Sequence, residues 1–177
     1  WPSQTEQGKS TGSSFVAITA TEDGTVLDVR SAQEIEPGAG LPKSGTGKVT
    51  LDRGDVLELV AGADKDLSGT RLRSDKPVQV IAGQSCAYVP DVMTGTCDHL
   101  EEAMLPEDTL GASYVVTMPV LLTPPQEETP TPFVIRLSAI LTDTTITFEP
   151  EVHAPITLGA GQIRDVRLEG DAIKNVL

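Results

Sequence analysis

The chain has 177 residues, of which 38% are hydrophobic and 22% charged, a balance typical of a globular protein that can bury a core without help from metals. Twenty-six acidic residues against 13 basic ones give a formal net charge of −13, which repels phosphate backbones and anionic lipid headgroups. No apolar run approaches the roughly 18 residues that a membrane helix requires. We therefore expect neither nucleic-acid binding nor membrane insertion.

Short apolar runs, separated by Gly, Pro, Asp, Asn and Thr turns, follow one another with the spacing typical of an all-β protein. Several alternate apolar with polar residues, as in Val56-Leu57-Glu58-Leu59, which favours antiparallel sheets with one buried face. The expected strands are residues 15–20, 25–30, 48–51, 56–60, 70–73, 78–82, 114–120, 133–139, 144–148, 156–158 and 163–168. One helical turn is expected over residues 98–104, capped by Asp98. These elements predict an antiparallel β-sandwich or jelly-roll-like fold.

An internal repeat divides the chain. Phe15-Val16 followed by Asp23-Gly24-Thr25-Val26 is similar to Phe133-Val134 followed by Asp143-Thr144-Thr145-Ile146, and the segments 49–56 and 64–67 are similar to 156–163 and 169–173 in the same order. We expect a polar segment over residues 1–14, a first β module over 15–120, a proline-rich connector over 121–132 and a partial second β module over 133–177. The second copy would lack the counterpart of strands 70–82. Its open sheet edge could be filled by another segment, another subunit or a donated strand.

The two cysteines, Cys86 and Cys97, do not have the CxxC spacing of a zinc site or of a thioredoxin-like redox pair. We predict a disulfide between them, which would stabilise the fold by about 3 kcal/mol in the chain-entropy model. Such bonds persist only in oxidising compartments. A secreted or cell-surface protein is therefore expected.

The region around these cysteines resembles the amino-terminal domain family of IgG Fc-binding proteins. The resemblance is carried by residues 66–71, by Ser74-Asp75-Lys76-Pro77-Val78 through Gly83, by Cys86, by Cys97-Asp98-His99-Leu100, and by Glu101 or Glu102 followed by Met104-Leu105-Pro106. A Trp-Gly pair commonly follows the family's second cysteine, and Leu110-Gly111 holds that place here. The resemblance implies a secreted or surface protein that contacts protein or glycan.

The disulfide loop and its flank form the first place to look for a partner, because binding residues concentrate on loops held by a rigid scaffold. Its candidate binding residues are Tyr88, Asp91, Asp98, His99 and Glu102. His99 could form a metal site with Asp98 and Glu102, but we favour a structural role in which its ring bonds a backbone carbonyl beside the disulfide.

Four carboxylates in turns, those of Asp52, Asp55, Asp64 and Asp66, are weak calcium candidates. Their spacing does not match an EF-hand loop, and Asp is ordinary in turns because its side chain bonds nearby backbone. We interpret Arg53-Gly54-Asp55 as a hairpin turn rather than an integrin-binding motif. No cofactor is expected.

The sequence gives little support for catalysis. No obvious base lies near any serine or threonine, and the 3% of aromatic residues argues against glycosidases and lectins. We predict a non-enzymatic recognition or adhesion module that binds protein or glycan outside the cell. The alternative is a structural subunit of a surface layer or filament completed by strand exchange, with self-association through an open sheet edge. An exported hydrolase is the third hypothesis.

Overall fold

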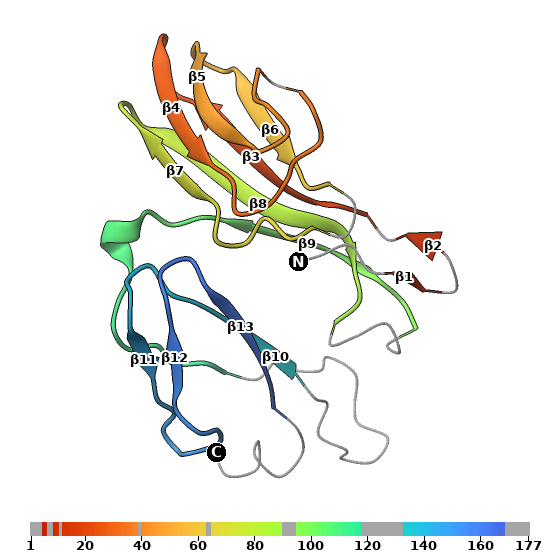
Figure 1. Ribbon diagram of the computed structural model, residues 1–177, viewed down its shortest axis with the longest axis vertical. Helices are drawn as coiled ribbons and strands as arrows, with labels where there is room; N and C mark the ends of the chain where they lie inside the picture. Colours follow the sequence, from red (N-terminus) through yellow and green to blue (C-terminus); the bar gives the residue numbers. More distant parts are fainter. Residues whose placement is uncertain are drawn as a thin grey trace. The chain divides into compact units, whose positions relative to one another are not determined.

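The computed structural model describes residues 5–6, 9–10, 12–38, 40–62, 65–89, 95–117 and 133–168. The chain divides into two compact units, Trp1–Leu105 (unit 1) and Pro106–Leu177 (unit 2). Throughout the described ranges the regular structure is antiparallel β-sheet, with a 3₁₀ turn at Glu107–Thr109 and no α-helix (Figure 1). The prediction of an all-β, antiparallel protein is confirmed.

Unit 1 holds a four-stranded sheet, a three-stranded sheet and a short two-stranded ribbon (Figure 1). The four-stranded sheet has the order β6-β3-β8-β9, with β6 (Val56–Val60), β3 (Ser14–Ala20), β8 (Val78–Ala87) and β9 (Asp98–Ala103). The three-stranded sheet has the order β5-β4-β7, with β5 (Thr46–Leu51), β4 (Thr25–Arg30) and β7 (Arg71–Ser74). The ribbon pairs β1 (Thr5–Glu6) with β2 (Lys9–Ser10).

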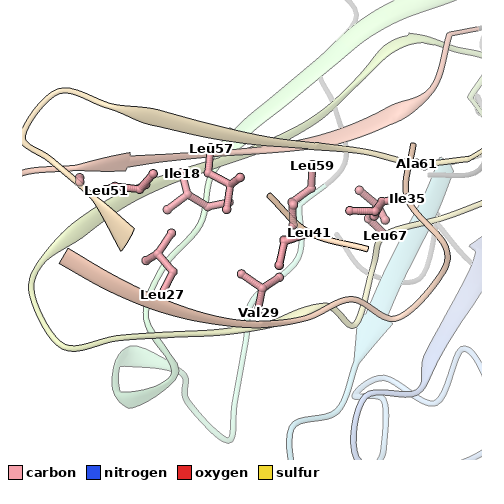
Figure 2. Packing of buried hydrophobic residues seen from close by; sticks show 11 residues of the cluster. Ile18, Leu27, Val29, Ile35, Leu41, Leu51, Leu57, Leu59, Ala61 and Leu67 are labelled. Atoms are coloured by element: carbon pink, nitrogen blue, oxygen red, sulfur yellow. The ribbon is translucent and has the colours of Figure 1, made fainter. Parts of the chain in front are cut away.

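The core of unit 1 contains residues from both larger sheets. Strand alternation turns Ile18 of β3 and Leu57 and Leu59 of β6 to one face of their sheet. Figure 2 shows these side chains pointing toward Leu27 and Val29 of β4. The buried members of this cluster are Ile18, Ala20, Leu27, Val29, Ile35, Leu41, Leu51, Leu57, Leu59, Ala61 and Leu67. Each large aliphatic side chain buried in this way contributes about 1.5–3 kcal/mol.

The described residues of unit 2 form two short antiparallel strand pairs. β10 (Phe133–Ser138) pairs with β13 (Ile163–Leu168), and β11 (Thr144–Ile146) pairs with β12 (Ile156–Leu158). The hydrophobic cluster of this unit has two buried members, Val166 and Leu168. The side chains packed against them are only partly buried; they are Phe133, Ile135, Leu137, Phe148, Val152 and Ile156. Among the described residues, unit 2 therefore has a much smaller core than unit 1.

The turn that leads into β4 has a close match in the turn that leads into β11. In unit 1 the Thr25 hydroxyl donates to the Glu22 carbonyl oxygen at 2.7 Å, and in unit 2 the Thr144 hydroxyl donates to the Leu141 carbonyl oxygen at 3.0 Å. The residue before each threonine has a positive φ, 64° at Gly24 and 57° at Asp143. The same local hydrogen bond and the same left-handed position thus occur in both turns.

The turn that leads into β6 likewise matches the turn that leads into β13. In unit 1 the Asp52 amide donates to the Asp55 carboxylate and the Gly54 amide to the Ala20 carbonyl oxygen, both at 2.9 Å. In unit 2 the Gly159 amide donates to the Gln162 side-chain oxygen at 2.8 Å and the Gly161 amide to the Ala139 carbonyl oxygen at 2.7 Å. In each unit a hydrogen bond thus joins the turn before one strand, β6 or β13, to the end of the strand paired with it, β3 or β10.

Two sequence-based predictions of local structure are wrong. Residues 98–103 of the expected helical turn form strand β9, which pairs with an extended β8. The open edge of β8 offers backbone partners along this whole segment, and that pairing overrides a weak helical pattern. Of the strand expected over residues 114–120, residues 114–117 form no strand, and residues 118–120 lie outside the described ranges.

Candidate binding surface beside the disulfide

The outer face of the four-stranded sheet carries an aromatic side chain, Phe15. Its neighbours along β3 are Ser14, which is buried, and Val16, which is partly buried and packs against the core. Because successive side chains of a strand point to opposite faces, the ring of Phe15 lies on the face turned away from the core. In the sheet register Phe15 lies opposite Val60 of β6 and Gly83 of β8.

Gly83 makes room for this ring. A Cβ atom at Gly83 would lie 2.6 Å from Cζ of Phe15 and 2.5 Å from the carbonyl oxygen of Leu100, both too close for any real side chain. The Phe15 ring therefore extends across the backbone of β8 toward β9. There it stacks on His99, with ring centroids 6.2 Å apart and an interplanar angle of 22°. A phenyl ring and an imidazole from strands far apart in the sequence thus form one surface.

The imidazole is oriented by a carboxylate on its own strand. His99 Nε2 donates to Glu101 Oε2 at 2.9 Å, and both side chains are about half exposed. Residues two apart on a strand share a face, so Glu101 lies on the same side of the sheet as His99 and Phe15. Such an exposed pair contributes little to stability, about 0–1 kcal/mol. Its main effect here is to fix the His99 ring and to add negative charge to the surface.

Strand β9 is the edge strand of its sheet and is strongly acidic. Asp98, Glu101 and Glu102 are all exposed, and β9 contains no lysine or arginine. Edge strands that carry charges of one sign repel copies of themselves, because like charges would meet across the new pairing. Of these three carboxylates, Glu101 lies on the same face as the Phe15–His99 pair, while Asp98 and Glu102 lie on the opposite face of the edge strand.

The disulfide predicted between Cys86 and Cys97 is present, with a Cα–Cα distance of 5.2 Å. Cys86 lies near the end of β8, and Cys97 directly precedes β9. The pairing of these strands shifts register between Gln84 and Ala87, so β8 carries an extra residue beside the bond. Such a bulge bends a strand and changes the direction of its side chains. The bond holds the two strands together where the regular ladder is interrupted.

The candidate residues of the disulfide loop do not gather at one point. Asp98 and Glu102 share one face of β9, and His99 lies on the other with Glu101. Tyr88 is half-buried just after β8, and Asp91 lies outside the described residues. His99 bonds a carboxylate at its Nε2 atom rather than a backbone carbonyl. Sequence reasoning did not include Phe15 or Gly83, because nothing in the sequence pairs them with His99.

The calcium candidates Asp52 and Asp55 bond backbone groups of turns. Asp52 Oδ1 accepts from the Gly24 amide and Asp55 Oδ2 from the Asp52 amide, both at 2.9 Å. Arg53-Gly54 forms a turn, as predicted, but the turn is not a hairpin, because β5 pairs with β4 and β6 pairs with β3 in the other sheet. Asp64 lies outside the described residues. Within the described ranges no three His, Cys, Asp or Glu side chains gather as a metal site would require.

Asp66 is likewise held by its neighbours. Burial raises the pKa of this carboxyl, but hydrogen bonds, that from the Ser68 backbone amide foremost, lower it to about 2. The Ser68 amide donates to Asp66 Oδ1 at 2.9 Å. The carboxylate is therefore charged at neutral pH and bonds its own turn.

The fold and this surface define a class of protein: an all-β, disulfide-bonded module in which a half-buried phenylalanine stacks on an exposed histidine. The family model described as IgGFc binding protein matches residues 1–175, so the chain belongs to the IgGFc-binding protein family. The human IgGFc-binding protein is 38% identical over 69 residues, which cover 39% of this chain and 1% of that protein. A search of solved structures gave no significant match. Along the described part of the chain, no helix is long and apolar enough to cross a membrane.

Proposed function

We propose that this chain is a non-enzymatic recognition module that acts outside the cell and binds a protein or glycan through the outer face of its four-stranded sheet. The observation that carries the proposal is the stacked Phe15–His99 pair, which lies on the face opposite to the core beside the disulfide. Aromatic side chains held on a rigid scaffold are typical contact residues of binding surfaces, and His99 is exposed while Phe15 is half-buried. A fixed ring pair loses little conformational entropy when a partner arrives.

The charge of the surface favours a basic partner. Glu101 lies on β9 on the same face as the ring pair, Asp98 and Glu102 lie on the other face of this edge strand, and the whole chain has a formal net charge of −13. A partner with a positive patch would be steered to this surface and would bind more weakly at high salt. The name of the human relative mentions the Fc part of IgG. A protein partner is therefore favoured over a glycan.

The proposal includes location and architecture. A disulfide is expected in oxidising compartments, which supports secretion or display at the cell surface. We also propose that unit 1 is a β-sandwich, since both of its larger sheets contribute to one core, and that unit 2 is a second copy of it. The matched turns support duplication. In these turns Gly24 corresponds to Asp143, whereas the sequence comparison pairs Gly24 with Thr144, one residue further along. The module boundaries 15–120, 121–132 and 133–177 belong to this proposal.

Two variants test the surface. Wild-type protein is assayed against human IgG Fc and against a glycan array, and the same probes are applied to His99→Gln combined with Glu101→Gln. Thr50→Ala, an exposed change on β5 of the other sheet, is the control. We expect roughly tenfold weaker binding by the double variant and little change in the control. Equal binding by all three proteins would remove this surface as the site, and binding of neither probe would contradict the choice of partner classes.

A structural subunit of a surface layer or filament is the second candidate. The observation in its favour is that, among the described residues of unit 2, β10 pairs with β13 alone and β11 with β12 alone. The third, an exported hydrolase, would require activity that one Asp or Glu substitution abolishes. Sedimentation of the purified chain at high concentration tests the second candidate, because a strictly monomeric chain does not build filaments.

A further inference from the structure

The outer face of the three-stranded sheet carries a dense group of basic side chains. Leu27 and Val29 of β4 and Leu51 of β5 are buried, and Leu72 of β7 packs against the core. Because successive side chains of a strand point to opposite faces, the residues that alternate with these lie on the face turned away from the core. On the three strands of the sheet β5-β4-β7 (Figure 1) they are Thr46, Lys48, Thr50, Val26, Asp28, Arg30, Arg71 and Arg73.

This surface, which we call the basic face, has a charge opposite to that of the whole chain. Its four cations are all exposed, and among the residues placed on it one, Asp28, is an acid; the cations are Arg30, Lys48, Arg71 and Arg73. Four basic residues and one acid give the face a formal charge of +3, in a chain whose formal net charge is −13. Asp28 Oδ1 lies 3.9 Å from Arg30 Nε, and one carboxylate neutralises at most one of the four cations.

The sheet register places two of these cations directly opposite each other. Arg30 of β4 pairs with Arg71 of β7, while Asp28 lies between Lys48 of β5 and Arg73 of β7. Like charges at directly opposite positions of a sheet are destabilising. An anionic group held between two guanidinium groups removes such repulsion, because each guanidinium offers several N–H donors in a planar fork that fits anionic oxygens. The arrangement thus costs stability in the free protein and favours an anionic ligand.

The spacing of the cations favours a ligand with closely spaced negative charges. Neighbouring strands lie about 4.8 Å apart, and residues two apart on one strand are separated by roughly 6.5 Å. Arg30 and Arg71 are one strand apart, Arg71 and Arg73 are two residues apart, and Lys48 lies one strand beyond β4. A single small anion would contact only part of this group. A polymer with several anionic groups per short segment can contact all four cations.

The composition of the basic face favours a sulfated glycan over other polyanions. None of the residues placed on it is aromatic, whereas proteins that bind single-stranded nucleic acid stack the bases on aromatic side chains. Its one apolar side chain, Val26, is half-buried, whereas protein interfaces have apolar or aromatic anchors at their centre. Thr46 and Thr50 add exposed hydroxyl groups that can bond sugar hydroxyls. Recognition through charge also needs no stacking on sugar rings.

We propose that the basic face binds a sulfated glycan, with Arg30, Arg71 and Arg73 donating hydrogen bonds to its sulfate groups. The site lies on the other sheet from the Phe15–His99 pair, and the inference goes beyond the function proposed above. The negative charge of the whole chain does not prevent binding, because exposed charges farther apart than the Debye length, about 8 Å at physiological ionic strength, are largely screened. At contact the nearby cations dominate the potential.

The test is a calorimetric titration of the whole chain with a heparin octasaccharide. Wild type is compared with Arg30→Gln combined with Arg73→Gln, and the control is Arg53→Gln combined with Arg164→Gln, which changes the net charge equally at exposed positions off the basic face. We expect saturable binding by wild type and control, and roughly tenfold or more weaker binding by the first variant. Raising the salt from about 0.1 M to about 1 M, where the Debye length falls to about 3 Å, should abolish binding.

A second measurement uses wild-type protein alone and does not depend on the folding of any variant. Amide chemical shifts recorded by NMR during the titration should change along β4, β5 and β7. The same octasaccharide without sulfate groups should not bind. Single-stranded DNA and polyglutamate of equal charge should each bind at least roughly tenfold more weakly, since the face has neither aromatic stacking groups nor an exposed apolar anchor.

Several outcomes would overturn the proposal. Absence of heparin binding, equal binding by the two double variants, or shift changes confined to other strands would remove the basic face as the site. Equal or tighter binding of the DNA would assign the face to nucleic acid, and of polyglutamate to an acidic protein, so either result contradicts the glycan. The His99→Gln and Glu101→Gln double variant should bind heparin as wild type does. Failure at the basic face can thus be distinguished from failure of the surface around Phe15 and His99.

Discussion

Phe15 and His99 stack across β8, which lies between their two strands in the sheet order. The glycine at position 83 leaves the space that the Phe15 ring needs. Aromatic pairs of this kind contribute about 0.5–1.5 kcal/mol beyond the burial of their area. The surface is therefore already formed in the free protein. Its arrangement depends on Gly83, a residue that has no side chain.

Gly83→Ala should disrupt this arrangement. The new Cβ would meet backbone at Leu100 and the ring of Phe15, so we expect a loss of about 1–3 kcal/mol in the free energy of unfolding. Urea unfolding measures the loss. Gly38→Ala is the control, because a Cβ at Gly38 would have no atom within 4 Å, and it should change stability by less than about 0.5 kcal/mol. Equal effects of the two substitutions would contradict the role given to Gly83.

Reduction of the Cys86–Cys97 bond should destabilise unit 1 without unfolding it. The bond closes a short loop, and its removal is expected to lower the free energy of unfolding by about 3 kcal/mol in the chain-entropy model. Thermal melts with and without reductant would show a lower Tm in the reduced sample. Two free thiols by mass spectrometry in the untreated protein, with an unchanged Tm, would contradict the bond.

The core of unit 1 should be sensitive to loss of volume at Leu27. This side chain has 0% exposure, so Leu27→Ala is expected to lower the free energy of unfolding by about 2–5 kcal/mol. Val56 is 57% exposed on the edge strand β6, and Val56→Ala should lower it by less than about 1 kcal/mol. Chemical denaturation of both variants provides the comparison.

The turn before β11 should prefer glycine at position 143. Asp143 has a φ of 57°, a left-handed conformation that glycine adopts without the strain that other residues incur. We expect Asp143→Gly to preserve or increase the stability of unit 2 and Asp143→Val to lower it by about 1–2 kcal/mol. Hydrogen exchange of the β11 amides reports the difference. Thr142→Val, a change beside it, should leave the exchange rates nearly unaltered.

Much of the sheet structure could be predicted from local patterns. The segments 25–30, 56–60, 156–158 and 163–168 form strands with the predicted bounds, because alternation and turn residues on both sides define them. β9 could not be found in this way, since Asp98–Ala103 has little β-propensity and pairs only because β8 presents an open edge.

The candidate site was harder to predict than the strands. The disulfide followed from cysteine chemistry alone, and His99 was singled out by its place beside Cys97. The contact between Phe15 and His99, however, depends on the order β3-β8-β9, which no single segment specifies. The same holds for Glu101, which shares a face with His99 only when the segment is a strand and not a helix.

The covalent bond between Cys86 and Cys97 also bears on how such a module can change over time. Because the bond joins β8 covalently to the residue before β9, the pairing of these strands depends less on the residues between the cysteines, apart from the buried Ala87, which itself pairs with Asp98. Substitutions and changes of length there should be tolerated far better than changes at Gly83 or Leu27. A lineage carrying this architecture could therefore acquire new specificities by altering one short stretch while the scaffold stays constant.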